Sequence, residues 1–191
     1  MPTFQPADRV TATILISHII VMFGGIIVLG NFFEFPDVLR YSAEERFSIF
    51  SENQTIIQAT YWALTMTGIT QILISVLLFH TARAQHFPAG TIALIFGSLA
   101  GFCQALGFGR WVILVPYLVA EAGSTGNMEI VTFLEGSFNR YSGMLVGEHL
   151  ANIFWGIWLA TINISLLKGT DLSRGLCWFG LALSPLLLLL A

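Results

Sequence analysis

A carboxylic acid and an imidazole stand next to each other inside an apolar stretch in the second half of the chain. They are Glu148 and His149, in the segment 141–168, YSGMLVGEHLANIFWGIWLATINISLLK. The segment is long enough to cross the hydrocarbon core of a bilayer, which takes about 20 helical residues. An ionised side chain at the centre of a membrane helix costs about 3 kcal/mol unless it is paired. These two residues are therefore the first place to look for chemistry.

Arg110 is a candidate partner for this acid. With about 1.5 Å of rise per helical residue, Arg110 falls near the outer end of the preceding apolar run, and Glu148 about 10 Å below the start of its own. A paired guanidinium and carboxylate tolerate such depth. The sequence predicts an outward-opening polar pocket that contains Arg110, Glu148, His149, Gln104 and Asn152. A ligand-binding or proton-handling site and a purely structural ion pair both fit this pattern.

Histidines inside apolar runs also raise the question of a tetrapyrrole. A neutral imidazole is a good axial ligand to haem or chlorophyll, and the candidates are His149 and His18. Each lies about 12 Å from a membrane boundary, but the two boundaries are opposite, so their levels differ by several Å and ligation by both is disfavoured. Metal ligation by one of these histidines stays open, beside the alternative that neighbouring groups simply satisfy each ring.

The composition is that of a membrane protein. The chain has 191 residues, of which 55% are hydrophobic and only 10% charged, whereas soluble domains carry about 25% charged residues. A net charge of -3 and the lack of any Lys/Arg cluster in the sequence argue against a nucleic-acid partner. The sequence contains no Walker, HExxH, GxSxG or dinucleotide-binding motif, which disfavours a hydrolase or a nucleotide-dependent enzyme.

Five apolar runs are the elements that must position these residues. We predict an all-α transmembrane helical bundle in a single domain, residues 1–191, with five or six spans. The runs are approximately 10–30, 55–80, 88–120, 141–168 and 175–191. The third is too long for one upright span, so we expect a break near Gly107–Gly109 or at Pro116. The last run ends at Ala191 without a polar tail, and a sixth span would follow it in a longer protein.

Two further patterns concern how the spans are connected and packed. The segments 42–50 and 129–140 mix charged and apolar residues, which is typical of amphipathic helices at the membrane interface. For 42–50, a solvated loop with a few aromatic residues among the lipid headgroups fits equally well. Small residues spaced four apart let helices approach closely. Such pairs occur at Gly97 and Gly101, and at Gly143 and Gly147. We expect the two pairs to pack against each other within the chain.

The distribution of positive charge predicts an orientation. Arg9, Arg83, Lys168 and Arg174 fall on one side of the predicted membrane, and both amphipathic segments fall on the other. Cytoplasmic loops carry an excess of Lys and Arg. The N-terminus is therefore expected in the cytoplasm.

The second half of the chain resembles a known family. The runs LGFGRWVILVPYLV (106–119) and FLEGSFNRYSGMLVGEHL (133–150) are similar to R-W-x-x-L-V-P and N-R-Y-x-G-x-x-x-G-E-H-L segments of an uncharacterised bacterial membrane protein family, domain of unknown function 4386. The first half is similar in hydropathy only. The resemblance implies a multi-span helical bundle in a bacterial inner membrane. It supplies no activity, substrate or catalytic residue.

Two classes of function follow from these observations. The first is a non-enzymatic accessory subunit of a larger membrane complex, which contacts membrane lipid and other membrane proteins and holds a lipid, quinone or pigment near Glu148 and His149. The second is a small membrane enzyme or transporter that uses Arg110, Glu148 and His149 as a polar site. A protein that binds haem or chlorophyll through one histidine is a further alternative.

Overall fold

The structure is a computed structural model that describes residues 6–81, 84–125, 127–169 and 173–189. All regular structure within these ranges is helical, which confirms the all-α class. Arg83, which was predicted to lie on the cytoplasmic side, and Ala191, the end of the last predicted run, lie outside the described residues. The helices, in chain order, are α1 (Pro6–Phe32), η1 (Asp37–Arg40), α2 (Ala43–Glu52), α3 (Gln54–Thr81), η2 (Ala84–His86), α4 (Pro88–Gly109), α5 (Leu114–Thr125), α6 (Met128–Phe138), η3 (Asn139–Leu150), α7 (Ala151–Gly169) and α8 (Arg174–Leu189).

Four helical runs in the described part of the chain are long and apolar enough to cross a membrane. They are Asp8–Phe32, Gln54–His80, Pro88–Ser124 and Met128–Gly169. These correspond to the first four predicted spans. The predicted fifth span corresponds to α8, an apolar helix of 16 residues that is shorter than the other four. The span count of five or six therefore stays a prediction.

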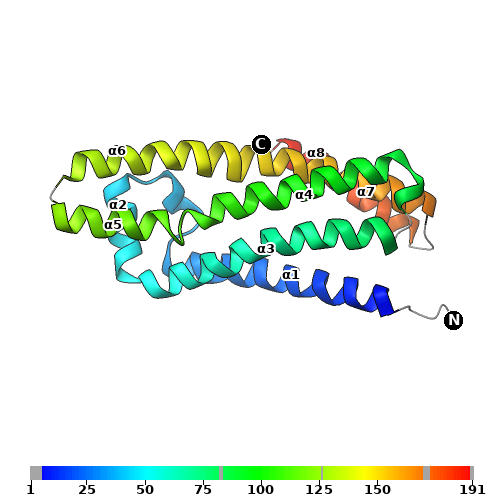
Figure 1. Cartoon of the computed structure of the whole chain (residues 1–191), viewed down its shortest axis with the longest axis horizontal. Helices are drawn as coiled ribbons and strands as arrows, with labels where there is room; N and C mark the ends of the chain where they lie inside the picture. The colour runs from blue at the N-terminus through cyan, green and yellow to red at the C-terminus, as the bar shows by residue number, and fades with distance from the viewer. Residues whose placement is uncertain (1–5, 82–83, 126, 170–172, 190–191) are drawn as a thin grey trace.

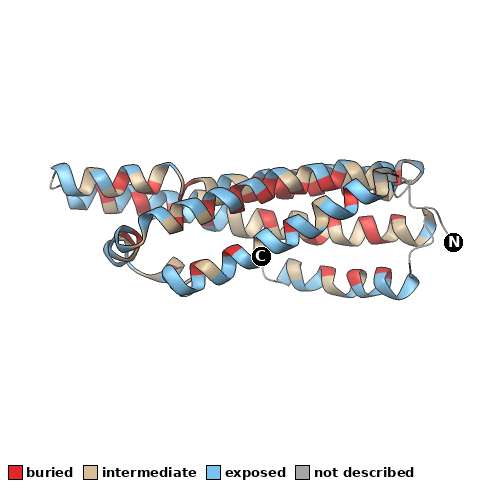
Figure 2. Cartoon of the chain, turned by 90° about the horizontal axis from the view of Figure 1, so that it is seen from below, coloured by how far each residue is buried: buried red, intermediate tan, exposed pale blue. Residues whose placement is uncertain are grey.

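The long helices form an elongated bundle with α3 and α4 at its centre (Figure 1). Helix α1 packs on α3, α7 packs on α4, and α8 packs on α7. The outer faces are apolar: α1, for example, exposes Ile16, Ile20, Phe23 and Ile27. Figure 2 shows buried residues concentrated where helices meet and exposed ones along the outer faces. A bundle that is apolar both inside and outside is suited to lipid rather than water.

The small residues pack helices closely, but in a pairing that differs from the prediction. A Cβ on Gly97 would overlap Ser75 and Trp158, and one on Gly101 would overlap the carbonyl of Gly68. The Gly97–Gly101 face of α4 therefore packs mainly against α3 and α7, and the expectation that it meets Gly143 and Gly147 is wrong. Helix spacing alone does not say which of several neighbours a small-residue face will meet.

The predicted break in the third span is confirmed. Helix α4 ends at Gly109, a turn follows, and α5 begins at Leu114, with Pro116 in its first turn. A proline fits there because the first N–H groups of a helix have no partner within the helix. Helix α5 then projects beyond the end of α1, antiparallel to α6 (Figure 1).

The two predicted amphipathic segments both form helices. The first is α2, which includes most of the predicted 42–50 segment. The second, α6, continues through η3 into α7 as one helical run, so it extends the axis of the fourth span and does not turn across it (Figure 1). The reason is that nothing between residues 129 and 168 breaks a helix: the segment contains no proline.

Helices α2, α5 and α6, with η1, form a cap over one end of the bundle, which we call the capped end. Its apolar core includes Phe33, Phe50, Trp111, Leu118 and Val131, contributed by segments far apart in the sequence. The rings of Phe33 and Trp111 meet edge to face at 4.8 Å between centroids. Aromatic contacts of this kind add to the burial of apolar area. The cap is therefore a packed unit that fixes the loops at this end.

A capping box starts α2. The backbone N–H of Glu45 donates to Ser42 Oγ at 3.3 Å, and the Glu45 carboxylate accepts from the Ser42 backbone N–H at 2.9 Å. These hydrogen bonds favour the charged carboxylate and hold the pKa of Glu45 below its ordinary value.

The stabilising effect of Glu45 is expected to depend on pH. Because its folded-state pKa is lowered, its contribution is present above the unfolded pKa of about 4.3 and is lost as the pH falls through the folded value. Glu45→Ala should therefore lower the thermal stability at about pH 7, and the difference from wild type should shrink toward about pH 2. Thermal unfolding of both proteins across this range measures the effect. An equal pH-dependent difference in Glu44→Ala, which alters the neighbouring exposed acid, would contradict the capping box as its source.

Candidate functional site

A pocket lies at the capped end, between the bundle and η1, with a volume of about 480 Å³. This size falls in the range of small-molecule sites, about 300–1,000 Å³. The lining residues come from the segment 35–40, which includes η1, from α3, from the last turn of α4 and the turn after it, and from η3. They are Phe35, Pro36, Leu39, Arg40, Tyr61, Gly107, Phe108, Arg110, Trp111, Gly143, Met144, Gly147, Glu148 and His149.

Arg110 is held on one wall of the pocket. Its Nη2 donates to Asn139 Oδ1 at 2.9 Å, and its guanidinium carbon lies 5.3 Å from the centre of the Trp111 ring. The side chain also fills the space that a Cβ on Gly143 would need. The residue is only 9% exposed, and its Nε has no hydrogen-bond partner among the described residues. A buried donor without a partner costs about 1–3 kcal/mol.

Tyr61 presents a second donor without a partner. Its ring is stacked on Trp111, with 5.2 Å between centroids, and the residue is 1% exposed. Its hydroxyl forms no hydrogen bond with any described residue. Tyr61 and Arg110 are close enough to interact electrostatically. Two buried donors without partners thus line one cavity.

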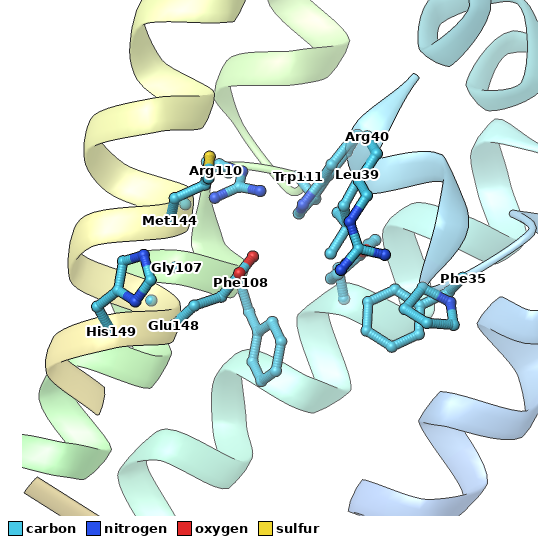
Figure 3. A pocket seen from close by; sticks show the side chains of 14 residues that line it. Phe35, Leu39, Arg40, Gly107, Phe108, Arg110, Trp111, Met144, Glu148 and His149 are labelled. Carbon is cyan, nitrogen blue, oxygen red and sulfur yellow. The ribbon is translucent and has the colours of Figure 1, made fainter. Parts of the chain in front are cut away.

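Glu148 and His149 enter the pocket from η3. In Figure 3 the Glu148 carboxylate and the Arg110 guanidinium point toward the same central space, and Arg40 approaches it from the opposite side. Glu148 interacts electrostatically with Arg110, but the two do not form an ion pair within 4.0 Å. The structure thus brings Arg110, Glu148 and His149 to one pocket, as the depth argument predicted.

The π-helical geometry of η3 determines which of its residues share a face with Glu148. In a π-helix the hydrogen bonds run from i to i+5, and such segments are rare and frequent at functional sites. Residues four or five positions apart then share a face, as do Asn139, Gly143, Met144 and Glu148. Gly147 meets Gly107 of α4 so closely that a Cβ on either would come within 2.8 Å of the other's Cα. This contact brings the η3 backbone directly against the end of α4.

Two predicted members of the site lie elsewhere. Gln104 does not line this pocket: its Nε2 donates to Thr67 Oγ1 at 2.8 Å and contacts Met22 Sδ at 3.2 Å, inside the bundle. The physical reason is angular, because six residues of an α-helix turn Gln104 about 120° away from Arg110. Asn152 also lies outside the pocket lining, in the first turn of α7.

His18 occupies a different environment from His149. Its Nδ1 lies 2.7 Å from Thr70 Oγ1, and its ring lies 6.2 Å from that of Trp155. Thr70 Oγ1 also lies 3.0 Å from the carbonyl oxygen of Thr67, so these three residues form one hydrogen-bonded chain inside the bundle. No cluster of three or more His, Cys, Asp or Glu residues with metal-binding geometry occurs in the described part of the chain.

Sequence reasoning missed Tyr61, Arg40 and Asn139 as members of this site. Tyr61 and Trp62 are adjacent aromatics near the end of a span, yet Tyr61 is buried and Trp62 is 53% exposed. One step along a helix rotates a side chain by about 100°, so the sequence does not say which ring faces inward. The signal available for Asn139 is its place in the N-R-Y-x-G run, beside the residues already selected.

The chain matches the model of the family described as Domain of unknown function (DUF4386) over residues 10–191. The match thus includes the first half of the chain, where only hydropathy had indicated a resemblance. No curated protein and no solved structure matches the chain.

Proposed function

We propose that this chain, which belongs to the DUF4386 family, is a non-enzymatic integral membrane protein. In this proposal it binds a small ligand with an anionic group in the pocket beside Arg110. The observation that carries the proposal is the pair of buried donors, Arg110 Nε and Tyr61 Oη, that line the cavity without partners among the described residues. Buried polar groups are nearly always hydrogen-bonded, so two donors without a partner in one cavity call for a hydrogen-bond acceptor there.

The chemistry of the walls indicates the kind of ligand. A guanidinium offers a rigid fork of donors that matches carboxylate and phosphate oxygens. Arg40 adds a second positive charge at the rim, and Phe35, Phe108 and Trp111 supply apolar contact area. A lipid headgroup or an acidic quinone-like molecule would meet these demands.

Removing the buried guanidinium is expected to empty the pocket. Wild type and Arg110→Met, purified in mild detergent, should differ in co-purifying small molecules, with at least about a tenfold depletion in the variant, because a hydrogen bond to a charged group contributes about 1.5–3 kcal/mol. Mass spectrometry of extracts measures this depletion. An absorption spectrum with a Soret or chlorin band that persists in Arg110→Met would contradict the proposal and favour a tetrapyrrole at His18 or His149.

A second variant separates binding from folding. Arg110 also bonds Asn139, so its loss can weaken the fold. Arg40 is exposed on η1, and Arg40→Met should leave the helical signal in circular dichroism unchanged while it lowers ligand content. Arg174→Lys, an exposed arginine at the start of α8, is the matched control and should retain the ligand. Equal ligand content in all four proteins would overturn the proposal.

The proposal also includes the setting of the pocket. We infer a bacterial inner membrane, a cytoplasmic N-terminus, a fifth span formed by α8, and partner subunits in a membrane complex. The support is the excess of Lys and Arg near one end of the spans, the apolar character of α8 and the small size of the chain. Cysteine-accessibility labelling at Arg9→Cys and Glu129→Cys on intact cells tests the orientation, since only the second should react with an impermeant reagent. Purification of the intact chain alone, with full ligand content, would contradict an obligatory complex.

A further inference from the structure

The pocket is lined by side chains of opposite charge. Arg110 lies on one wall and Arg40 at the rim, while the Glu148 carboxylate enters from η3 toward the same space (Figure 3). Arg110 Nη2 donates to Asn139 Oδ1, and no ion pair within 4.0 Å joins Arg110 to Glu148. In the described part of the chain, the ion pair within 4.0 Å is that of Arg46 with Glu135. It lies elsewhere in the cap. The acid and the guanidinium thus border the same cavity without forming an ion pair with each other.

A charge in such a site requires a partner. A carboxylate near a low-dielectric wall is costly when it is not neutralised, as is a guanidinium. A ligand with only an anionic group would satisfy Arg110 and leave Glu148 repelled. A ligand that also carries a cation, a few Å from its anionic group, would satisfy the guanidinium and the carboxylate at once.

We propose that the ligand is a zwitterion, with a primary ammonium at Glu148 and an anionic group at Arg110 and Arg40. This inference rests on the proposed function and names the ligand class for the same pocket. Phosphoethanolamine has this chemistry, either as the headgroup of a membrane lipid or as a free molecule. A primary ammonium has three N–H donors for the carboxylate, whereas the trimethylammonium of choline has none.

The position of the pocket is compatible with a lipid headgroup. It lies at the end of the bundle where α1 ends at Phe32 and α3 begins at Gln54, beside the exposed side chain of Met144. Headgroups lie at the ends of membrane spans, and the acyl chains of a bound lipid would lie along the apolar outer faces.

The test measures the preference for an ammonium group. Dihexanoyl phosphatidylethanolamine, phosphatidylglycerol and phosphatidylcholine are titrated into the detergent-solubilised chain, and native mass spectrometry reports the bound fraction. Wild type should bind the ethanolamine lipid at least about tenfold more tightly than the other two, because only its headgroup offers the carboxylate a charged hydrogen-bond donor. Glu148→Gln should remove this preference. Glu52→Gln, which alters an exposed acid of α2, should keep it.

The outcomes separate this inference from the proposed function. If Glu148→Gln keeps the preference, or if wild type has none, the zwitterion is wrong; the proposed function still stands when Arg110→Lys weakens the binding of all phospholipids. If neither Glu148→Gln nor Arg110→Lys changes the affinity for any of the three phospholipids, both proposals fail. Free phosphoethanolamine identifies the source: binding as tight as that of the short-chain lipid supports a free zwitterion, and binding of the lipid alone supports a membrane headgroup.

Discussion

Glu135→Gln is expected to destabilise the protein by about 3–5 kcal/mol, because it leaves the Arg46 guanidinium buried without its counter-charge. Arg46 and Glu135 are 5% and 3% exposed. Arg46 Nε donates to Glu135 Oε1 at 3.1 Å, Nη2 pairs with Oε2, and Nη1 donates to the carbonyls of Tyr41 and Leu39. One side chain therefore joins α2, the 39–41 loop and α6. Thermal or denaturant unfolding in one detergent measures the loss.

A double replacement distinguishes a buried charge from lost packing. Arg46→Met with Glu135→Leu removes both charges and keeps apolar volume, so it should recover much of the stability that Glu135→Gln loses. The recovery is incomplete because the Tyr41 and Leu39 carbonyls lose their donor. Glu129→Gln, an exposed acid on the same helix, should change stability by less than about 1 kcal/mol. A double variant as unstable as Glu135→Gln would show that the pair is not the cause.

This ion pair also illustrates what the sequence did not predict. Both residues belong to segments recognised as amphipathic, but 89 positions separate them, and no local pattern joins them. The cap forms because α6 runs back along α5 and packs on α2, an arrangement that depends on tertiary packing. Hydropathy predicted that the segments lie outside the spans and did not predict that they contact one another.

The sequence predicted the depth of the site residues along their helices but not the direction in which each side chain points. Rise along the helix gives depth, and the three residues that depth selected, Arg110, Glu148 and His149, line one pocket. The angle around each helix is not fixed by depth, which is why Gln104 was misplaced and Tyr61 missed. The π-helical hydrogen bonding of η3 changes that angle again, since it alters which residues of NRYSGMLVGEHL share a face. Composition gives no signal for it.

Gly107→Ala and Gly143→Ala are expected to fail in different ways. A Cβ on Gly107 would lie 2.7 Å from the Cα of Gly147, and because backbone cannot give way cheaply, α4 and η3 must separate. We expect a loss of about 1–3 kcal/mol, typical of overpacking. A Cβ on Gly143 would instead displace the end of a flexible side chain, that of Arg110. Gly143→Ala should therefore unfold at nearly the wild-type temperature but lose the ligand held by Arg110.

Thermal unfolding and ligand content, measured on the same samples, separate the two effects. Gly136→Ala is the matched control on α6, because a Cβ there meets nothing within 4 Å. It should be neutral or stabilising by up to about 1 kcal/mol, since alanine restricts the unfolded chain more than glycine does. If Gly143→Ala kept its ligand, Arg110 would have a second productive position, and the guanidinium held against Gly143 would not be what selects the anion. If Gly107→Ala were as stable as Gly136→Ala, the close contact of α4 with η3 would not be what holds the pocket together.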